Sequence, residues 1–166
     1  MAENPATNDT NQAAPSLNAL AQYAKDFSFE NPNAPRSFQT PPNNQPEISI
    51  QVNIDVAQLA EADFEVELAL EGSAKVGEEV LFAFDLKYAG IFRLQGIPQE
   101  NFHPVLYIEC PRLLFPFGRQ IVADAVRNGG FPPLYIDPID FVELYRQKAA
   151  EAQAAAEERG NAPLSS

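Results

Sequence analysis

Residues 78–92, EEVLFAFDLKYAGIF, have the pattern of a β-strand with one apolar and one polar side. Successive side chains of a strand point to opposite faces of its sheet, so residues two apart share a face. The apolar side would carry Val80, Phe82, Phe84, Leu86 and Tyr88, and the other side Glu79, Leu81, Ala83, Asp85 and Lys87. This segment therefore predicts a strand of an antiparallel sheet that is buried on one face and solvated on the other.

Three further segments, residues 21–30, 47–57 and 63–74, show the same alternation and predict three more strands. Burying a large apolar side chain stabilises the fold by roughly 1.5–3 kcal/mol, and burying an unpaired carboxylate destabilises it. A shift of one residue in strand pairing would expose the apolar side chains and bury the carboxylates, so the pattern fixes the register. In the first of these strands Tyr23, Phe27 and Phe29 share one parity, on which Lys25 is the exception. Together the four strands predict a sheet whose solvent-facing side is acidic.

Prolines and glycines predict the connections between the strands. Residues 31–46 contain several prolines, which remove hydrogen-bond donors from a strand, so this segment is expected to be a long crossover loop. Residues 73–77 predict a hairpin between the last two strands. Gly90 and Gly96 are expected to mark the point where the chain leaves the sheet.

The second half of the chain predicts helices. Residues 99–109 fit either a strand around VLYIE or a helix broken near Pro104, and the helix is favoured. Residues 111–128 have two apolar stripes at helical spacing: Leu114, Phe117, Ile121 and Ala125, and Phe115, Val122 and Val126. We expect one stripe to pack on the sheet and the other on a neighbouring subunit. Asp137 and Pro138 are expected to begin a last helix as its N-cap and first residue.

Length and composition favour one folded domain with loose ends. The chain has 166 residues, of which 45% are apolar. Residues 1–16 lack aromatic side chains and predict a disordered arm, residues 17–148 predict the folded domain, and residues 149–166 predict an alanine-rich helix that frays into a disordered tail. No signal peptide and no membrane-spanning run is recognisable, so we expect a cytoplasmic protein.

Charge limits the partners. The chain has 23 acidic and 11 basic residues and a formal charge of −12, which repels nucleic-acid backbones and anionic membrane surfaces. We therefore expect no nucleic acid and no membrane insertion, and favour a basic protein partner.

Several of these segments resemble the SecB family of protein-export chaperones. They are YAKDFSFENPNAP (23–35), AGIFRLQGI (89–97) and CPRLLFPFGRQIVADAVRNGGFPPLYIDPIDFVELY (110–145). The resemblance implies an α+β subunit with a four-stranded antiparallel sheet, helices packed on one face, and a tetramer built as a dimer of dimers. It further implies a chaperone that acts without ATP, holds unfolded precursor proteins and delivers them to the SecA motor.

The resemblance also assigns residues. The acidic face of the sheet would meet the basic, zinc-bearing tail of SecA, and the matching contact positions are Asp26, Glu30, Ala83 and Asp85; Ala83 departs from the leucine usual in the family. The apolar strand positions Phe84, Leu86 and Tyr88 are expected to support the tetramer. Phe38 on the crossover loop, with Leu134 and Phe141 near the last helix, are the candidates for a client groove.

Cys110 and His103 could be imagined as a nucleophile and its base. Neither lies in a nucleophile motif, so we expect no catalytic residue, no metal and no cofactor.

Two alternatives to the chaperone remain open from the sequence. The first alternative is a small α+β enzyme of thioesterase-like fold whose acidic residues serve catalysis. The second is an acidic homo-oligomeric scaffold that binds no client.

Overall fold

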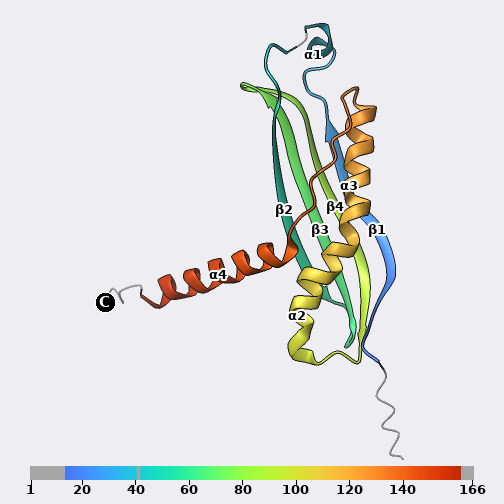
Figure 1. Ribbon diagram of the computed structural model, residues 1–166, viewed down its shortest axis with the longest axis vertical. Helices are drawn as coiled ribbons and strands as arrows, with labels where there is room; N and C mark the ends of the chain where they lie inside the picture. The colour runs from blue at the N-terminus through green and yellow to red at the C-terminus, as the bar shows by residue number, and fades with distance from the viewer. Residues whose placement is uncertain (1–13, 41, 162–166) are drawn as a thin grey trace, which may run out of the picture.

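The computed structural model describes residues 14–40 and 42–161, so most of the expected N-terminal arm lies outside the described part. Its centre is a four-stranded antiparallel sheet with strand order β1-β4-β3-β2 (Figure 1). The strands are β1 (Ser16–Glu30), β2 (Glu47–Gln58), β3 (Asp63–Val76) and β4 (Glu79–Gln95). The predicted α+β class and four-stranded sheet are confirmed, and the first strand begins five residues earlier than expected.

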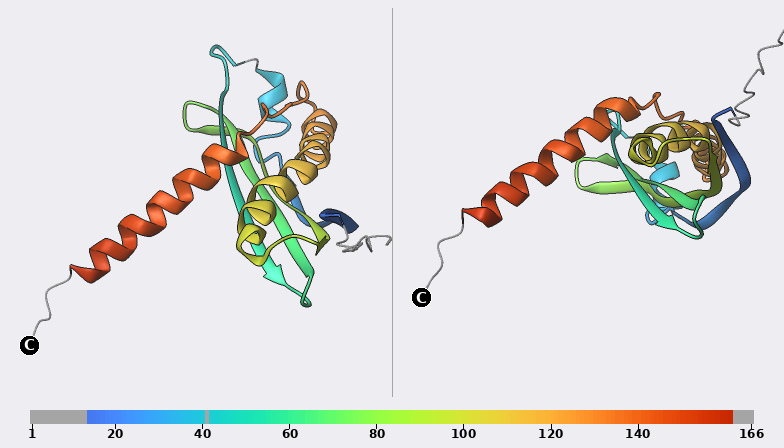
Figure 2. Two further views of the ribbon diagram at one scale, coloured as in Figure 1. Left: turned by 60° about the horizontal axis from the view of Figure 1, so that its bottom comes forward. Right: turned by 90° about the horizontal axis from the view of Figure 1, so that it is seen from below.

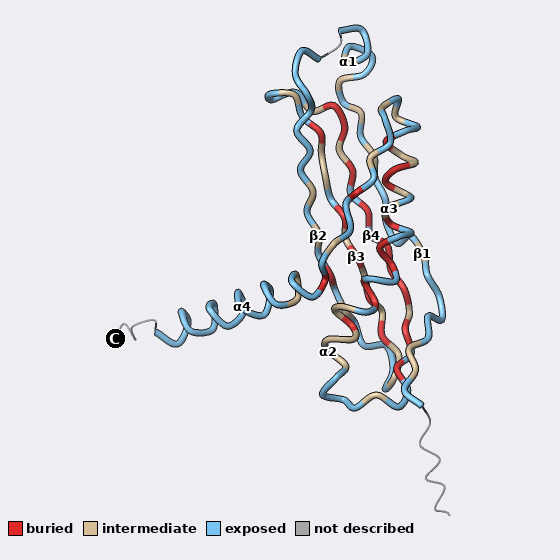
Figure 3. Tube along the Cα trace, viewed as in Figure 1, coloured by how far each residue is buried: buried red, intermediate tan, exposed pale blue. Residues whose placement is uncertain are grey.

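One face of the sheet is covered by helices and the other is open (Figure 2). We call these the apolar face and the polar face. Along most of β3 and β4 burial alternates as predicted, and the apolar face carries the buried residues Val66, Leu68, Leu70, Phe84 and Leu86. Figure 3 shows that the buried segments lie mainly along β3, β4 and α3. Leu81 and Ala89 are buried although they have the polar parity. At Leu81 the register with β3 shifts between Ala74 and Lys75, which leaves Leu81 without a partner residue and places Val80 opposite Lys75, so the predicted apolar position of Val80 is wrong.

Strand β1 has two register shifts, and the second one corrects the predicted faces. Between Ala24 and Asp26 the pairing with β4 skips Lys25, which makes Lys25 the extra residue of a β-bulge. A bulge reverses the parity, so Tyr23 points to the polar face whereas Phe27 and Phe29 point to the apolar face. The expectation that these three aromatics share a face is therefore wrong.

Gly90 does not end a strand as expected. β4 continues through it to Gln95, and Gly96, with φ of +66°, ends the strand as predicted. A Cβ on Gly90 would meet Phe92 at 2.8 Å and Leu114 at 3.1 Å, so glycine is required there by close packing. The predicted hairpin between β3 and β4 is confirmed, and Gly77 at φ of +60° forms its turn.

The helical prediction for residues 99–109 is confirmed. A 3₁₀ turn η1 (Gln99–Asn101), the short α2 (Phe102–Pro104) and a π-helical turn η2 (Val105–Glu109) lead directly into α3 (Cys110–Asn128). Pro104 lies in the first turn of α2, where it does not break the helix. Pro111 has no backbone N–H, and the turn before it is widened. The backbone N–H of Cys110 therefore donates to the carbonyl of Val105, five residues back, and not to that of the residue four back.

Helix α3 lies across the apolar faces of β3 and β4. Leu114, Phe115, Val122 and Val126 are buried, so the second predicted stripe and Leu114 pack on the sheet. Gly118 brings the helix close to the sheet, because a Cβ at this position would lie 3.2 Å from Leu70.

The last helix, α4 (Phe141–Gly160), projects away from the body of the subunit (Figures 1 and 2). Its N-cap is Asp140, whose carboxylate accepts a hydrogen bond from the backbone N–H of Glu143 at 3.1 Å. The expected start at Asp137 and Pro138 is therefore wrong by one helical turn. The alanine-rich part is helical to Gly160 and exposed on all sides from Arg146 onward, and its fraying stays a prediction.

The crossover loop between the two edge strands contains the short helix α1 (Arg36–Gln39). The loop is held by two asparagine side chains. Asn31 donates to the carbonyl of Gly129 at 2.9 Å, and Asn33 donates to the carbonyl of Val80 at 2.6 Å. The loop is thereby fastened both to the end of α3 and to the start of β4.

Candidate docking face and apolar surfaces

The polar face brings together the four positions expected to contact SecA. In the register of β1 with β4, Glu30 lies opposite Ala83 and Ser28 lies opposite Asp85. Asp26 lies opposite Lys87, two residues further along both strands. All four positions therefore share one face on two neighbouring strands, as their parity predicted, and the bulge at Lys25 lies just outside the group.

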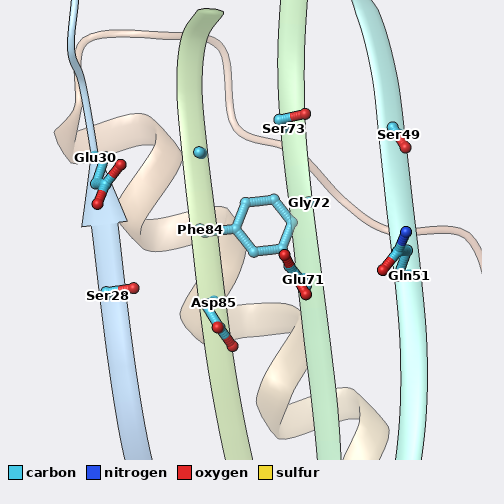
Figure 4. A pocket seen from close by; sticks show the side chains of 10 residues that line it. Ser28, Glu30, Ser49, Gln51, Glu71, Gly72, Ser73, Phe84 and Asp85 are labelled. Atoms are coloured by element: carbon cyan, nitrogen blue, oxygen red, sulfur yellow. The ribbon is translucent and has the colours of Figure 1, made fainter.

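A shallow depression of about 320 Å³ lies on this face (Figure 4). Five of its ten lining residues are small, and three carry carboxylates. Its lining residues are Ser28, Glu30, Ser49, Gln51, Glu71, Gly72, Ser73, Ala83, Phe84 and Asp85. Three of the four expected contact positions line this depression, and Asp26 does not.

Other carboxylates on the same face are paired with neighbouring side chains. Lys25 binds Glu65 at 2.7 Å and Glu67 at 3.3 Å, and the Tyr23 hydroxyl donates to the second oxygen of Glu65. The hydrogen bond from Lys25, assisted by that from Tyr23, holds the pKa of Glu65 below its usual value. Burial and the bond to Glu65 raise the pKa of Tyr23. Lys25 offsets one of the two negative charges, so this network keeps one net negative charge that is shared between Glu65 and Glu67.

Asp63 is paired in a similar way. Arg93 binds both of its carboxylate oxygens, at 2.7 and 2.8 Å, and this hydrogen bonding lowers the pKa of Asp63. In contrast, no ion pair within residues 14–40 and 42–161 involves Asp26, Glu30, Glu71 or Asp85. Glu30, Glu71 and Asp85, which line the depression, are therefore without an ion pair in the described part of the chain, and Asp55, opposite Glu67, is a further exposed carboxylate on the same face.

The positions assigned to the tetramer are core residues of the subunit. Phe84 and Leu86 are 3% and 0% exposed, and Tyr88 is buried beneath the ring of Phe117. Leu86 and Tyr88 lie beneath α3 of their own chain, and the assignment of all three residues to the tetramer stays a prediction. Strand parity identified them as buried but could not tell which element covers them.

The exposed apolar stripe lies instead on the outer side of α3. Leu113 and Phe117 are 46% and 52% exposed, and Ile121 continues the stripe one turn further. Phe27 of the edge strand β1 lies next to it, across a groove of about 470 Å³ that also includes Ile121. The sequence contained this signal, because Phe117 and Ile121 belong to the first of the two predicted stripes.

The three candidates for a client groove do not form one surface. Phe38 is half exposed and packs on Phe131 with ring centroids 5.1 Å apart. Leu134 is partly buried against the core, and Phe141 is 2% exposed and packs on Phe115. Phe141 anchors the first turn of α4, so its assignment to an accessible groove is wrong in this conformation.

Apolar clefts that the sequence did not reveal lie where α2, η2 and α4 approach strand β2. One of about 200 Å³ is lined by Ile54, His103, Tyr107, Leu144, Tyr145, Lys148, Ala149 and Ala152. An adjacent one of about 390 Å³ includes Phe64, Phe102 and Tyr107. Nothing in a linear pattern places these residues together, because the residues of the first cleft alone come from four separate elements.

Cys110 and His103 are not arranged as a nucleophile and a base. Cys110 is fully buried, and burial raises the pKa of its thiol to about 12, which opposes formation of the thiolate. The imidazole Nδ1 of His103 lies 2.8 Å from the hydroxyl of Tyr145, which joins α4 to α2. In the described parts of the chain, no three potential ligands are grouped for a metal ion, and no helix is long and apolar enough to span a membrane.

Comparison with known proteins assigns the family. Residues 10–152 match the model of the family described as "Preprotein translocase subunit SecB". The chain belongs to the SecB family. A protein-export protein SecB from Methylocella silvestris is 62% identical over 93% of this chain and 95% of the relative. One from Beijerinckia indica is 60% identical over 94% of this chain and 97% of the relative. The predicted family of protein-export chaperones is thereby confirmed.

The fold is shared with a solved structure of low sequence similarity. A SecB-like chaperone from Mycobacterium tuberculosis, solved in complex with a ChAD peptide from the HigA1 antitoxin, superposes with a TM-score of 0.61 at 15% identity. The match covers 74% of this chain and 90% of that one. The family assignment favours the predicted protein-export chaperone over the thioesterase-like enzyme and the scaffold without a client.

Proposed function

We propose that this SecB-family protein works as a tetramer in the cytoplasm, holds unfolded precursors without ATP, and passes them to SecA through its polar face. The observation that carries the proposal is that the two sides of the sheet present different surfaces. Unneutralised carboxylates gather on one face, and exposed apolar side chains and clefts lie on the helical side. Neither task requires a bond to be made or broken.

Client binding is supported by the apolar clefts beside β2 and by the exposed Phe38 of the crossover loop. Such surfaces bind apolar side chains without recognising a particular sequence. The solved structure of the same fold is a complex with a peptide, which supports a peptide-binding role for this chain. The test is to mix the protein with a slowly folding precursor in the absence of nucleotide and to look for a stable complex by gel filtration. If no complex forms and the precursor refolds at its normal rate, the chaperone proposal is wrong.

Docking to SecA is supported by the charges around the depression. Individual exposed ion pairs contribute only about 0–1 kcal/mol, but several fixed carboxylates together attract a basic partner and speed its association. We expect the affinity for SecA to fall steeply as ionic strength rises. Reversing Asp26, Glu30 and Asp85 to lysine should abolish SecA binding and leave client holding intact, because the apolar surfaces lie on the other side of the sheet. Unchanged SecA affinity in this variant would contradict the docking assignment.

A further inference from the structure

Glu71 is not among the contact positions that the resemblance assigned, yet it stands at the centre of the polar face. It lies on β3 directly opposite Asp85 of β4, and both side chains are exposed. Figure 4 shows the two carboxylates on adjacent strands, with Glu30 at the end of β1 beside them. Like charges placed directly opposite in a sheet repel each other. This pair is therefore unfavourable in the free subunit.

The register shows what surrounds the pair. One cross-strand row contains Ser28, Asp85, Glu71 and Gln51, and the next row contains Glu30, Ala83, Ser73 and Ser49. Neither row contains a basic residue. The nearest bases in register are Lys87, which lies opposite Asp26, and Lys75, which lies opposite Glu47. The three carboxylates Glu30, Glu71 and Asp85 thus line one depression whose rows hold no cation of this chain.

The walls between these carboxylates are low. Ala83, Ser73 and Ser49 carry short side chains on this face. An incoming side chain can therefore approach the strands closely at this point.

We propose that Glu71 is a specificity-determining residue of the docking face, where it shares with Asp85 a lysine or arginine side chain from a basic segment of the partner. The segment would run across β4 onto β3 rather than along β1 alone. This inference rests on the proposed docking to SecA and extends the contact surface to a third strand. Binding relieves the repulsion between Glu71 and Asp85, so part of the affinity comes from a charge arrangement that is unfavourable in the free protein.

The test compares Glu71→Gln with Glu67→Gln in the full-length protein. Both variants remove one negative charge from the same strand and the same face, but Glu67 is already paired with Lys25. Titration calorimetry with SecA at low salt should show an affinity loss of about two- to fivefold for Glu71→Gln and an unchanged affinity for Glu67→Gln. Thermal unfolding should show a raised midpoint for Glu71→Gln, because the repulsion is removed.

A merely structural role for Glu71 would not raise stability while lowering affinity. If the unmodified protein binds SecA and Glu71→Gln binds equally well, the inference is wrong although the docking proposal survives. If both glutamine variants weaken binding equally, only net charge matters and the inference is also wrong. If the unmodified protein does not bind SecA at all, the docking proposal itself fails. As a further check, Glu71→Gln should have a smaller effect in an Asp85→Asn background, because the two residues share one cation.

Discussion

Lys25 connects a local irregularity of β1 to the charge of the whole polar face. As the extra residue of a bulge, it is directed over β3 and forms ion pairs with Glu65 and Glu67. The pKa of Glu65 is lowered mainly by the hydrogen bond from Lys25, so the ionised form is favoured in the folded state. Ionised Glu65 therefore stabilises the fold fully at pH values above 4.5, the ordinary pKa of its carboxyl group. This contribution is lost as the pH falls through the lower pKa of the folded state.

We expect Glu65→Gln to lower the free energy of unfolding at neutral pH by about 1 kcal/mol or less. The difference between the variant and the unmodified protein should stay constant above the ordinary carboxyl pKa and shrink below it. Urea unfolding at fixed protein concentration, repeated across the acidic range, measures this difference. A difference that persisted unchanged under strongly acidic conditions would contradict the assigned pKa shift. Glu151→Gln, the same change at an exposed carboxylate of α4, is the matched control.

At the residue scale the sequence contains signals for features that strand parity alone does not predict. Lys25 stood out as a charge on the apolar parity, and a bulge is the physical explanation for such an exception. Asp140 and Glu143 have the spacing of an N-cap and its third residue, which marks the start of α4 better than Asp137 does. Glu71 was placed on the polar side by its parity, but only the register of β3 with β4 shows that it faces Asp85.

Helix α3 depends on a close approach to the sheet at Gly118. We expect Gly118→Val to lower the free energy of unfolding by about 1–3 kcal/mol, since a Cβ alone would already lie 3.2 Å from Leu70 and 3.6 Å from Leu86. Thermal or urea unfolding measures the change. Gly160→Val is the control, because no atom lies within 4 Å of a Cβ placed there. Equal stability of the two variants would show that the helix can shift away from the sheet at little cost.

The strands and helices were largely predictable, because the alternation along each strand and the helical spacing of α3 are local sequence patterns. The element that packs on each of them could not be predicted from such patterns. Phe84 and Leu86 were correctly placed on the apolar parity, yet parity cannot distinguish burial under a helix of the same chain from burial against another subunit. The first cleft beside β2 requires four elements to meet, which no local pattern encodes.

At the scale of the whole molecule, an uncovered apolar stripe on α3 beside the free edge of β1 is the surface best suited to join subunits. We expect Phe117→Glu to disrupt the proposed tetramer, because assembly would bury an unpaired carboxylate at a cost of several kcal/mol. The subunit should remain folded, since Phe117 is half exposed within it. Sedimentation should then show smaller species with an unchanged circular dichroism spectrum. Leu86→Glu is the contrasting variant: Leu86 is 0% exposed under α3, so the charge would enter the core and unfold the subunit itself. An intact tetramer of Phe117→Glu would place the interface elsewhere.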